Sequence, residues 1–457
     1  MFEKILIANR GEIAVRIART CRELGVRTVA VYSTADADSR HVLLCDESVC
    51  IGPPPGGRSY RNAAAIVEAA CQTGADAVHP GYGFLSEDPD FAEICGQAGL
   101  TFIGPSPDAL QVLGDKATAR AWMERAGVAL LSGTAAVPAS AAEAKDLADQ
   151  LGYPVIIKAS AGGGGRGMTA VGNPADFLRC HAETSAAALA LFGDDRVYVE
   201  RYLPGARHVE VQFLCDQSGA GIHLGTRDCS VQRRHQKLVE EAPAPGLSRQ
   251  TVREMSESAL RGALAAGYVG VGTAEFLVDA DERHYFLEVN GRIQVEHPVT
   301  EMVSRIDLVQ EQLLVASGSR IRYKQEDVRL EGHAIECRVN AEDPYRMFAP
   351  TPGVLDRFLP PGGPFTRVDS HGRPGYRVGP DYDSLLAKVI VWAPDRDQAI
   401  SRMERALAEF DIGGDGIRTT IPFLLTVLAN SDFRKVRHST DLAGRLLDKS
   451  DNHKNMR

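Results

Sequence analysis

Short apolar runs alternate with amphipathic segments through the first 110 residues, and this pattern constrains the fold more than any other feature of the sequence. Residues 5–8 form a buried-strand run, Ile-Leu-Ile-Ala, and residues 12–24 carry apolar side chains at helical spacing. Strands joined to helices by short connections are typical of a parallel sheet with helices on both faces. The sequence therefore predicts an N-terminal doubly wound α/β domain. Its further strands are expected at 29–32, 77–78 and 101–103, and its further helices at 63–71 and 91–98.

Charge, apolar runs and cysteine usage exclude several classes of protein. The 457 residues include 51 Lys and Arg against 60 Asp and Glu, and a net charge of -9 does not suit a protein that binds a nucleic-acid backbone. No apolar run approaches the roughly 18 residues of a membrane span, and the run after Lys4 is too short for a signal peptide. The nine cysteines are scattered without a C-x-x-C pair, which favours reduced thiols over disulfides or zinc. We expect a cytoplasmic protein of about three domains that binds neither nucleic acid nor membrane.

A glycine-rich loop marks the second unit of the chain. After a stretch rich in Ala, Ser and Pro, strands are expected at 155–158, 168–171 and 197–200, as in a small α+β module. The loop at 162–167, Gly-Gly-Gly-Gly-Arg-Gly, lies between the first two strands, where its backbone N–H groups can approach an anion closely. No Gly-Lys-Ser/Thr follows, so it is not a P-loop. A flexible linker is the alternative, but Lys158 beside the loop favours phosphate binding.

A row of alternate polar residues begins at Glu288. Because the side-chain period of an extended chain is two, these residues would share one face of a strand. The alternative is the solvated face of an edge strand. However, Asn is a poor strand former, and oxygen ligands, an amide and a guanidinium in one row suit a binding site. The row consists of Glu288, Asn290, Arg292, Gln294 and Glu296.

A β-hairpin is expected from strands at 274–278 and 285–289 around a turn-rich segment. If its centre lies between Asp281 and Glu282, Glu275 faces Glu288. Two carboxylates directly opposite repel one another unless a cation lies between them, and Mg²⁺ prefers such hard oxygen ligands. Glu275, Glu288 and the Asn290 oxygen are therefore a candidate metal set, with two solvated carboxylates as the alternative.

Two further segments suggest a function only in this context. Residues 228–237 are basic within an acidic protein, which indicates either a solvated patch or an anion site. Residues 79–87, His-Pro-Gly-Tyr-Gly-Phe-Leu-Ser-Glu, follow a strand end and suit either a packed turn or a functional loop at the carboxyl edge of the sheet.

Together these segments resemble biotin carboxylase, the ATP-grasp enzyme family that carboxylates biotin, over nearly the whole chain. The similar motifs begin with Ile-Leu-Ile-Ala-Asn-Arg-Gly-Glu-Ile-Ala at residue 5, and the others lie at 79–87, 162–167, 228–243, 292–301 and 332–344. The resemblance implies a mixed α/β and α+β fold of three parts. These are an N-terminal doubly wound, parallel-sheet domain over 1–114, an ATP-grasp domain over 115–330 with a mobile lid over 131–203, and a C-terminal mixed, β-rich domain over 331–447.

The resemblance also implies a role for each matching residue. Glu296 would deprotonate bicarbonate, Arg338 would stabilise the biotin enolate, and Tyr82 would lie near the biotin. Bicarbonate would be held by Lys237, Arg292, Gln294 and the backbone N–H of Val295, and the metal by Glu275, Glu288 and Asn290. The ATP contacts would be Lys116, Lys158, Gly164, Gly165, Glu200, Arg201, Tyr202, Leu203, His208, Gln232 and His235.

Cofactors and partners follow from the same resemblance. They are ATP, two Mg²⁺ or Mn²⁺ ions in each site, bicarbonate, and biotin as a carrier-bound substrate. The chain lacks the Ala-Met-Lys-Met biotin-attachment sequence, so the carrier protein and the carboxyltransferase are expected as separate chains, most commonly of an acetyl-CoA carboxylase in fatty-acid synthesis. Arg16, Arg19 and Glu23 match the family's dimer interface, which implies a homodimer.

Two residues depart from the family pattern, and two other functions compete. Gly291 stands where Thr, Ala or Pro is common and could loosen the aim of Arg292, and Arg201 stands where Lys is frequent. An ATP-grasp ligase for another carboxylate is the first alternative function. A non-catalytic scaffold is the second, although such a chain should have lost charged groups from the row at 288–296.

Overall fold

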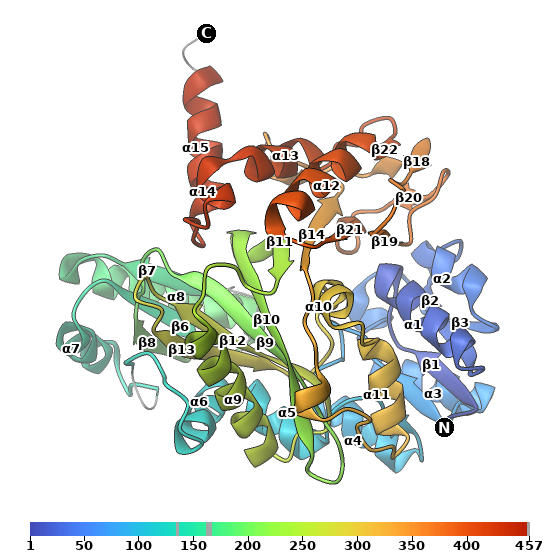
Figure 1. The fold of residues 1–457 in the computed structure, drawn as a ribbon. Helices are drawn as coiled ribbons and strands as arrows, with labels where there is room; N and C mark the ends of the chain where they lie inside the picture. The colour runs from blue at the N-terminus through green and yellow to red at the C-terminus, as the bar shows by residue number, and fades with distance from the viewer. Residues whose placement is uncertain (134–136, 161–166, 455–457) are drawn as a thin grey trace.

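A computed structural model describes residues 1–133, 137–160 and 167–454 of the chain (Figure 1). The N-terminal part is a five-stranded parallel sheet in the order β3-β2-β1-β4-β5, which confirms the predicted doubly wound domain. Of the five strands in this sheet, only β3 was not predicted, because it is largely exposed and lacks a continuous apolar run. The elements are β1 (Lys4–Ile7), α1 (Gly11–Glu23), β2 (Arg27–Ser33), α2 (Arg40–Leu44), β3 (Glu47–Gly52), α3 (Ala63–Thr73), β4 (Ala77–His79), α4 (Pro89–Gln97), β5 (Thr101–Phe102) and α5 (Pro107–Gly114).

A small separate sheet forms the expected α+β module. Its three strands are antiparallel in the order β7-β6-β8, and Lys158 pairs with Met168 across the ends of the two strands that flank the glycine-rich loop. The module has its own apolar core, which includes Val155, Phe177 and Val199. The elements from α6 onward are α6 (Lys116–Arg125), α7 (Ala141–Leu151), β6 (Val155–Ala159), β7 (Met168–Val171), α8 (Phe177–Phe192) and β8 (Val197–Arg201).

An eight-stranded sheet runs through the middle of the molecule in the order β13-β12-β9-β10-β11-β14-β21-β19, all neighbours antiparallel. Figure 1 shows it passing from the green and yellow strands into the orange ones without a break. The predicted domain boundary at 330–331 therefore lies between elements of one sheet. Its strands and the helices against it are β9 (Arg207–Cys215), β10 (Gly221–Arg233), β11 (Gln236–Ala242), α9 (Arg249–Ala265), β12 (Gly270–Val278), β13 (His284–Asn290), α10 (His297–Ser304), α11 (Leu308–Ala316), β14 (His333–Asn340), β19 (Thr366–Ser370) and β21 (Leu385–Ala393).

The two faces of the C-terminal half of this sheet differ sharply. One face carries Ile335, Cys337 and Val389 into the largest apolar core, which α12 and α13 cover. The opposite face carries charged residues and packs against α10 and α1. The remaining elements are β15 (Glu342–Asp343), β16 (Ala349–Pro350), β17 (Gly353–Val354), β18 (Arg357–Leu359), β20 (Arg377–Val378), α12 (Arg396–Glu409), β22 (Asp411–Gly413), α13 (Ile421–Ala429), α14 (Ser431–Arg434) and α15 (Leu442–Lys454).

Within the part of the chain that the structure describes, no helix combines the length and the apolar character that a membrane crossing requires.

Candidate active site

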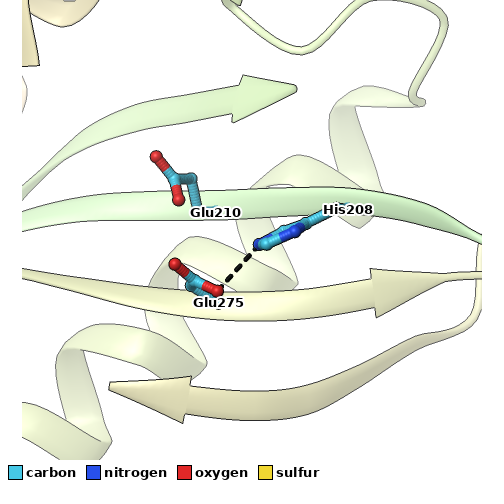
Figure 2. A group of neighbouring side chains, drawn as sticks. All are labelled: His208, Glu210 and Glu275. Carbon is cyan, nitrogen blue, oxygen red and sulfur yellow. Dashed lines mark ion pairs between the residues drawn. The ribbon is translucent and has the colours of Figure 1, made fainter. Parts of the chain in front are cut away.

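Three buried glutamates converge on one lysine at the centre of the eight-stranded sheet. Glu210 on β9 pairs directly with Glu275 on β12, and Figure 2 shows both beside His208. The Lys237 Nζ lies 2.7 Å from Glu210, 3.0 Å from Glu275 and 2.6 Å from Glu296. His208 Nε2 lies 2.9 Å from the second oxygen of Glu275. The Lys237 ammonium therefore lies between three carboxylates that would otherwise repel one another.

Lys237, Glu275 and Glu296 are held in their ionised forms. Burial alone would raise the pKa of Glu275 and of Glu296, but the neighbouring cations, Lys237 first among them, together outweigh it and hold both pKa values below their ordinary value of 4.5. Burial would likewise lower the pKa of Lys237, but the surrounding carboxylates raise it well above its usual range. Both carboxylates are thus available as metal ligands or bases at neutral pH.

A second buried cation, Arg227, contacts the cluster through Glu210. Its guanidinium donates to Glu210 and, at 2.7 Å, to Gln212 Oε1, and its side chain is fully buried. Thr273 and Thr300 accept its remaining hydrogen bonds at 3.1 and 2.9 Å. Sequence inspection missed both Arg227 and Glu210, although Glu210 lies two positions after His208 on β9 and so shares its face of the strand.

The hairpin has the register that the sequence predicted, while the metal role of its residues stays a prediction. Glu275 pairs with Glu288, and a bulge follows directly, because Phe276 pairs with Phe286. Asn290 Nδ2 donates to Glu275 at 2.9 Å, so the amide lies within the same group. Two carboxylates on neighbouring strands beside an amide oxygen are a donor set that fits Mg²⁺.

The predicted extended row over 288–296 is wrong beyond Asn290, where β13 ends. The chain then turns, and Glu296 becomes the residue that precedes helix α10, because His297-Pro298 place a proline in the first helical turn, where it is favoured. The polar side chains nevertheless gather on one side. Arg292 donates to Gln294 Oε1 at 2.7 Å and to Asn290 Oδ1 at 3.1 Å.

Glu296 joins the lysine cluster to the residue expected to act on biotin. Its second carboxylate oxygen accepts from Arg338 Nη2 at 2.9 Å. Arg338 also donates through Nε to Glu240 at 2.6 Å. Burial, opposed by Arg338 and reinforced by the charge of Glu296, raises the pKa of Glu240 to about 7.

Tyr82 and Val295 complete the side of the site that faces the N-terminal domain. The Tyr82 hydroxyl donates to Glu12 at 2.6 Å, and burial followed by the charge of Glu12 raises the pKa of Tyr82 well above its usual value. The Val295 carbonyl accepts from Lys388 Nζ at 2.7 Å. The loop at 79–87 therefore lies beside the candidate site, where Glu87 contacts Arg292, and its function stays a prediction.

The expected ATP contacts lie on both sides of the junction between the small sheet and the large one. Glu200 on β8 is buried and paired with both Lys158 and Arg120. Burial, and then the charges of His208 and Lys158, lower the pKa of His235, so the two sheets approach each other here. Gln232 Nε2 lies 3.3 Å from His208 Nδ1. Arg201 and Tyr202 are exposed and Leu203 is partly buried, whereas Gly164, Gly165 and the Lys116 side chain lie outside the described residues.

Comparison with known proteins decides the family. Three family models match successive segments: "Biotin carboxylase, N-terminal domain" over 1–110, "Carbamoyl-phosphate synthase L chain, ATP binding domain" over 115–324, and "Biotin carboxylase C-terminal domain" over 336–444. Biotin carboxylase 1 of Bacillus subtilis is 53% identical over 434 residues, which cover 95% of this chain and 96% of that protein. The chain belongs to the biotin carboxylase family. The family predicted from the motifs is therefore confirmed.

Solved biotin carboxylase structures agree with the fold. A complex from Campylobacter jejuni matches with a TM-score of 0.95 and 46% identity, and the match covers 97% of this chain and 99% of that one. The biotin carboxylase domain dimer of the Hydrogenobacter thermophilus 2-oxoglutarate carboxylase, solved with MgADP, ADP and bicarbonate, matches with a TM-score of 0.94 and 45% identity over 96% of this chain and 97% of that one. The predicted fold class, the ATP-dependent ligase class, and ATP and Mg²⁺ as cofactors are confirmed.

The departure from the family at Gly291 leaves Arg292 firmly held. The Gly291 N–H donates to one oxygen of Glu87 at 2.9 Å, and Arg292 Nε donates to the other at 2.8 Å. A Cβ at position 291 would lie 3.0 Å from Leu110 Cδ2, so glycine also suits the packing. Sequence inspection quoted Glu87 in a motif but missed this role, because 204 positions separate it from Gly291.

The three residues expected at a biotin carboxylase dimer interface are in different environments. Arg16 is buried within the chain and donates to Glu301 at 2.9 Å and to Asp307 at 2.7 Å. Arg19 is partly exposed, 3.9 Å from Asp369, and Glu23 is exposed. Arg19 and Glu23 are therefore the accessible members of this set.

Proposed function

We propose that this chain carries out the first half-reaction of a biotin-dependent carboxylase at the site described above, by ATP-dependent carboxylation of biotin on a carrier protein. The observation that carries the proposal is the position of Glu296, which contacts Lys237 at 2.6 Å and Arg338 at 2.9 Å. One carboxylate thus lies between the residues proposed to hold bicarbonate and the residue proposed to act on biotin.

Bicarbonate would bind beside Lys237 and Arg292, with Gln294 and the Val295 N–H completing its pocket. Ionised Glu296 removes its proton, which turns a weak nucleophile into one able to attack the γ-phosphate of ATP. Magnesium held by Glu275, Glu288 and Asn290 would neutralise charge on the phosphates. ADP leaves, and the product is carboxyphosphate, a mixed anhydride.

Carboxyphosphate would be destroyed by water, which gives a reason for a lid. The small sheet of β6, β7 and β8 supplies Lys158 and Glu200, and closure of residues 131–203 over the nucleotide would exclude water. The ureido nitrogen of biotin is barely acidic. A fixed guanidinium at Arg338, beside the developing enolate oxygen, provides the electrostatic stabilisation that the second step needs.

The partners in this proposal are separate chains. The carrier would present biotin to Arg338 and Tyr82 and then move to a carboxyltransferase, and two copies of this chain would form a homodimer in the cytoplasm. Acetyl-CoA is the acyl acceptor we favour, because it is the commonest acceptor for a carboxylase built of separate subunits.

The test is ATP hydrolysis by the purified chain, measured with and without bicarbonate and with free biotin added. We expect hydrolysis to require bicarbonate and to be stimulated by biotin. Folded protein that hydrolyses ATP without either dependence would refute the proposal, and a screen of other carboxylates by phosphate release would then identify another ligase.

Two variants test the assigned roles. Glu296→Ala and Arg338→Ala should each lose carboxylation by about 10²- to 10⁴-fold, the usual contribution of one acid–base or charge-stabilising group. Both should still bind ATP, because neither residue contacts the nucleotide side of the site. Loss of ATP affinity by calorimetry in either variant would contradict the roles given.

A further inference from the structure

Lys388 is a fully buried cation at the point where three parts of the chain meet. It lies on β21, and its neighbours across the sheet are Arg338 on β14 and Asp369 on β19. Directly paired residues of neighbouring strands point to the same face. Lys388 is therefore on the charged face, beside the arginine proposed to act on biotin.

The Lys388 ammonium makes two contacts outside its own sheet. Its Nζ donates to the Val295 carbonyl at 2.7 Å and lies 2.9 Å from Glu12 Oε1. That same Glu12 oxygen accepts the Tyr82 hydroxyl at 2.6 Å. A continuous chain of contacts therefore runs from Val295 through Lys388 and Glu12 to Tyr82.

We propose that Lys388 is a positioning residue that couples the bicarbonate side of the site to the biotin side. The inference rests on the proposed roles of Glu296 and Tyr82. The Val295 carbonyl belongs to the peptide unit that joins Val295 to Glu296, so the hydrogen bond from Lys388 fixes the backbone that carries the proposed base. Through Glu12, the same ammonium fixes the hydroxyl of Tyr82.

A purely structural role explains these contacts less well. A buried ion pair is often no more stabilising than apolar residues of similar volume, so stability alone gives little reason for a charge here. Among the described residues, Glu12 Oε2 is buried and has no hydrogen-bond partner, so the carboxylate directs its contacts entirely through Oε1. Both donors to Glu12 thus share one oxygen, so displacing one of them alters the position of the oxygen that the other contacts.

The ammonium remains charged in this environment. Burial would lower the pKa of Lys388, but Glu12, Glu336 and Asp369 raise it overall. Arg338, its direct neighbour on β14, is a second cation, whereas burial and the charge of Lys388 lower the pKa of His297 well below its usual value. A neutral His297 adds no further charge beside Lys388.

The experiment compares Lys388→Met, Glu12→Gln and Tyr82→Phe by three measurements: ATP affinity, bicarbonate-dependent ATP hydrolysis, and its stimulation by free biotin. Misplacing a reacting group slightly can cost up to about 10²-fold, so each variant should lose about 10- to 100-fold in the biotin-stimulated rate. Only Lys388→Met should also raise the KM for bicarbonate, because only Lys388 contacts Val295. ATP affinity should stay unchanged in all three.

Matched controls separate positioning from stability. Arg396→Met removes another mostly buried cation, which pairs with Glu241 on the opposite face of the sheet. It should lower the unfolding temperature but leave the ratio of biotin-stimulated to basal hydrolysis unchanged. Lys145→Met, on a surface helix, should change neither.

A double variant tests the coupling itself. If Lys388 and Tyr82 act through Glu12, the Lys388→Met, Tyr82→Phe double variant should lose little more biotin stimulation than the worse single variant. Losses that multiply, or a stimulation ratio that falls equally in Arg396→Met, would overturn the inference. If Lys388→Met does not fold, Glu12→Gln and Tyr82→Phe carry the same test, and full biotin stimulation in both overturns it. Wild-type protein without biotin stimulation would instead refute the proposed function.

Discussion

Glu240 and Glu241 are consecutive residues of β11 whose side chains point to opposite faces of the sheet, and their pKa values move in opposite directions. Burial raises the pKa of Glu240 to about 7, although Arg338 opposes the shift. Glu241 is equally buried, but His333 and Arg396 outweigh burial and hold its pKa at about 2. The partners of each carboxylate, rather than its depth, therefore decide its charge at neutral pH.

Replacing Glu240 should make stability less sensitive to pH near neutrality. The folded chain binds a proton at Glu240 that the unfolded chain releases near pH 4.5, so this residue costs stability as pH rises from about 4.5 to about 7. In Glu240→Gln that cost, on the order of 3 kcal/mol for 2.5 pH units, is absent. Urea midpoints at pH 5.5 and 8 should show the variant gaining on the wild type at pH 8. No relative gain would contradict the raised pKa.

Replacing Glu241 should have the opposite dependence on pH. Its folded pKa of about 2 lies below the ordinary 4.5, so it stabilises the fold above pH 4.5 and this contribution is lost as pH falls toward 2. Glu241→Gln leaves Arg396 and His333 without their anion and should lower stability by about 3 kcal/mol at pH 7. Denaturant unfolding should show the gap narrowing as the pH falls from about 4.5 toward 2. A gap that stays constant would be evidence against this account.

At the scale of elements, the local sequence pattern predicted which strands pair in the hairpin better than it predicted where the second strand ends. The β12–β13 hairpin brought Glu275 opposite Glu288 as expected, because turn composition and strand alternation fix hairpin register locally. The row at 288–296 failed as a strand because His297-Pro298 begins α10 immediately after it. Its residues still meet, since Arg292 is held by Glu87 from a loop that no local pattern connects to it.

The loop after β4, through Glu87, should therefore fix the orientation of the Arg292 guanidinium. Glu87→Ala removes the acceptor for both Gly291 N–H and Arg292 Nε and should lower kcat/KM for bicarbonate by about 10- to 100-fold. Glu87→Gln keeps an acceptor oxygen and should lose less. The measurement is initial-rate ATP hydrolysis at varied bicarbonate, with the KM for ATP as the internal control. Equal effects on both substrates would show that the loop does not act through Arg292.

At the scale of the whole molecule, the small sheet of β6, β7 and β8 is the part most independent of the rest. Its apolar core contains residues only from within 144–199, whereas each of the two largest apolar cores combines residues more than 200 positions apart. This separation was predictable from the sequence, because the module is contiguous. The contacts that assemble the site, such as Lys388 to Val295, join residues about a hundred positions apart and have no local signal.

ATP binding should slow hydrogen exchange in this module more than elsewhere. Closure over a nucleotide would shield residues 155–160 and 197–203, and we expect about tenfold slower amide exchange there with a non-hydrolysable ATP analogue and Mg²⁺. Strands β14 and β21, already buried in the large sheet, should change little. Uniform slowing across the chain would indicate general stabilisation by the ligand instead of lid closure.

The unbroken run of hydrogen bonds from β13 to β19 has a consequence for protein engineering. β11 and β14 pair from Val239 to Ala242, so separating the chain near residue 330 would strip both strands of a partner and expose their backbone groups. The two fragments produced by a cut near residue 330 should aggregate unless they are expressed together. Exchange of a segment between related chains should be better tolerated at the borders of the small sheet, because that segment includes its own apolar core.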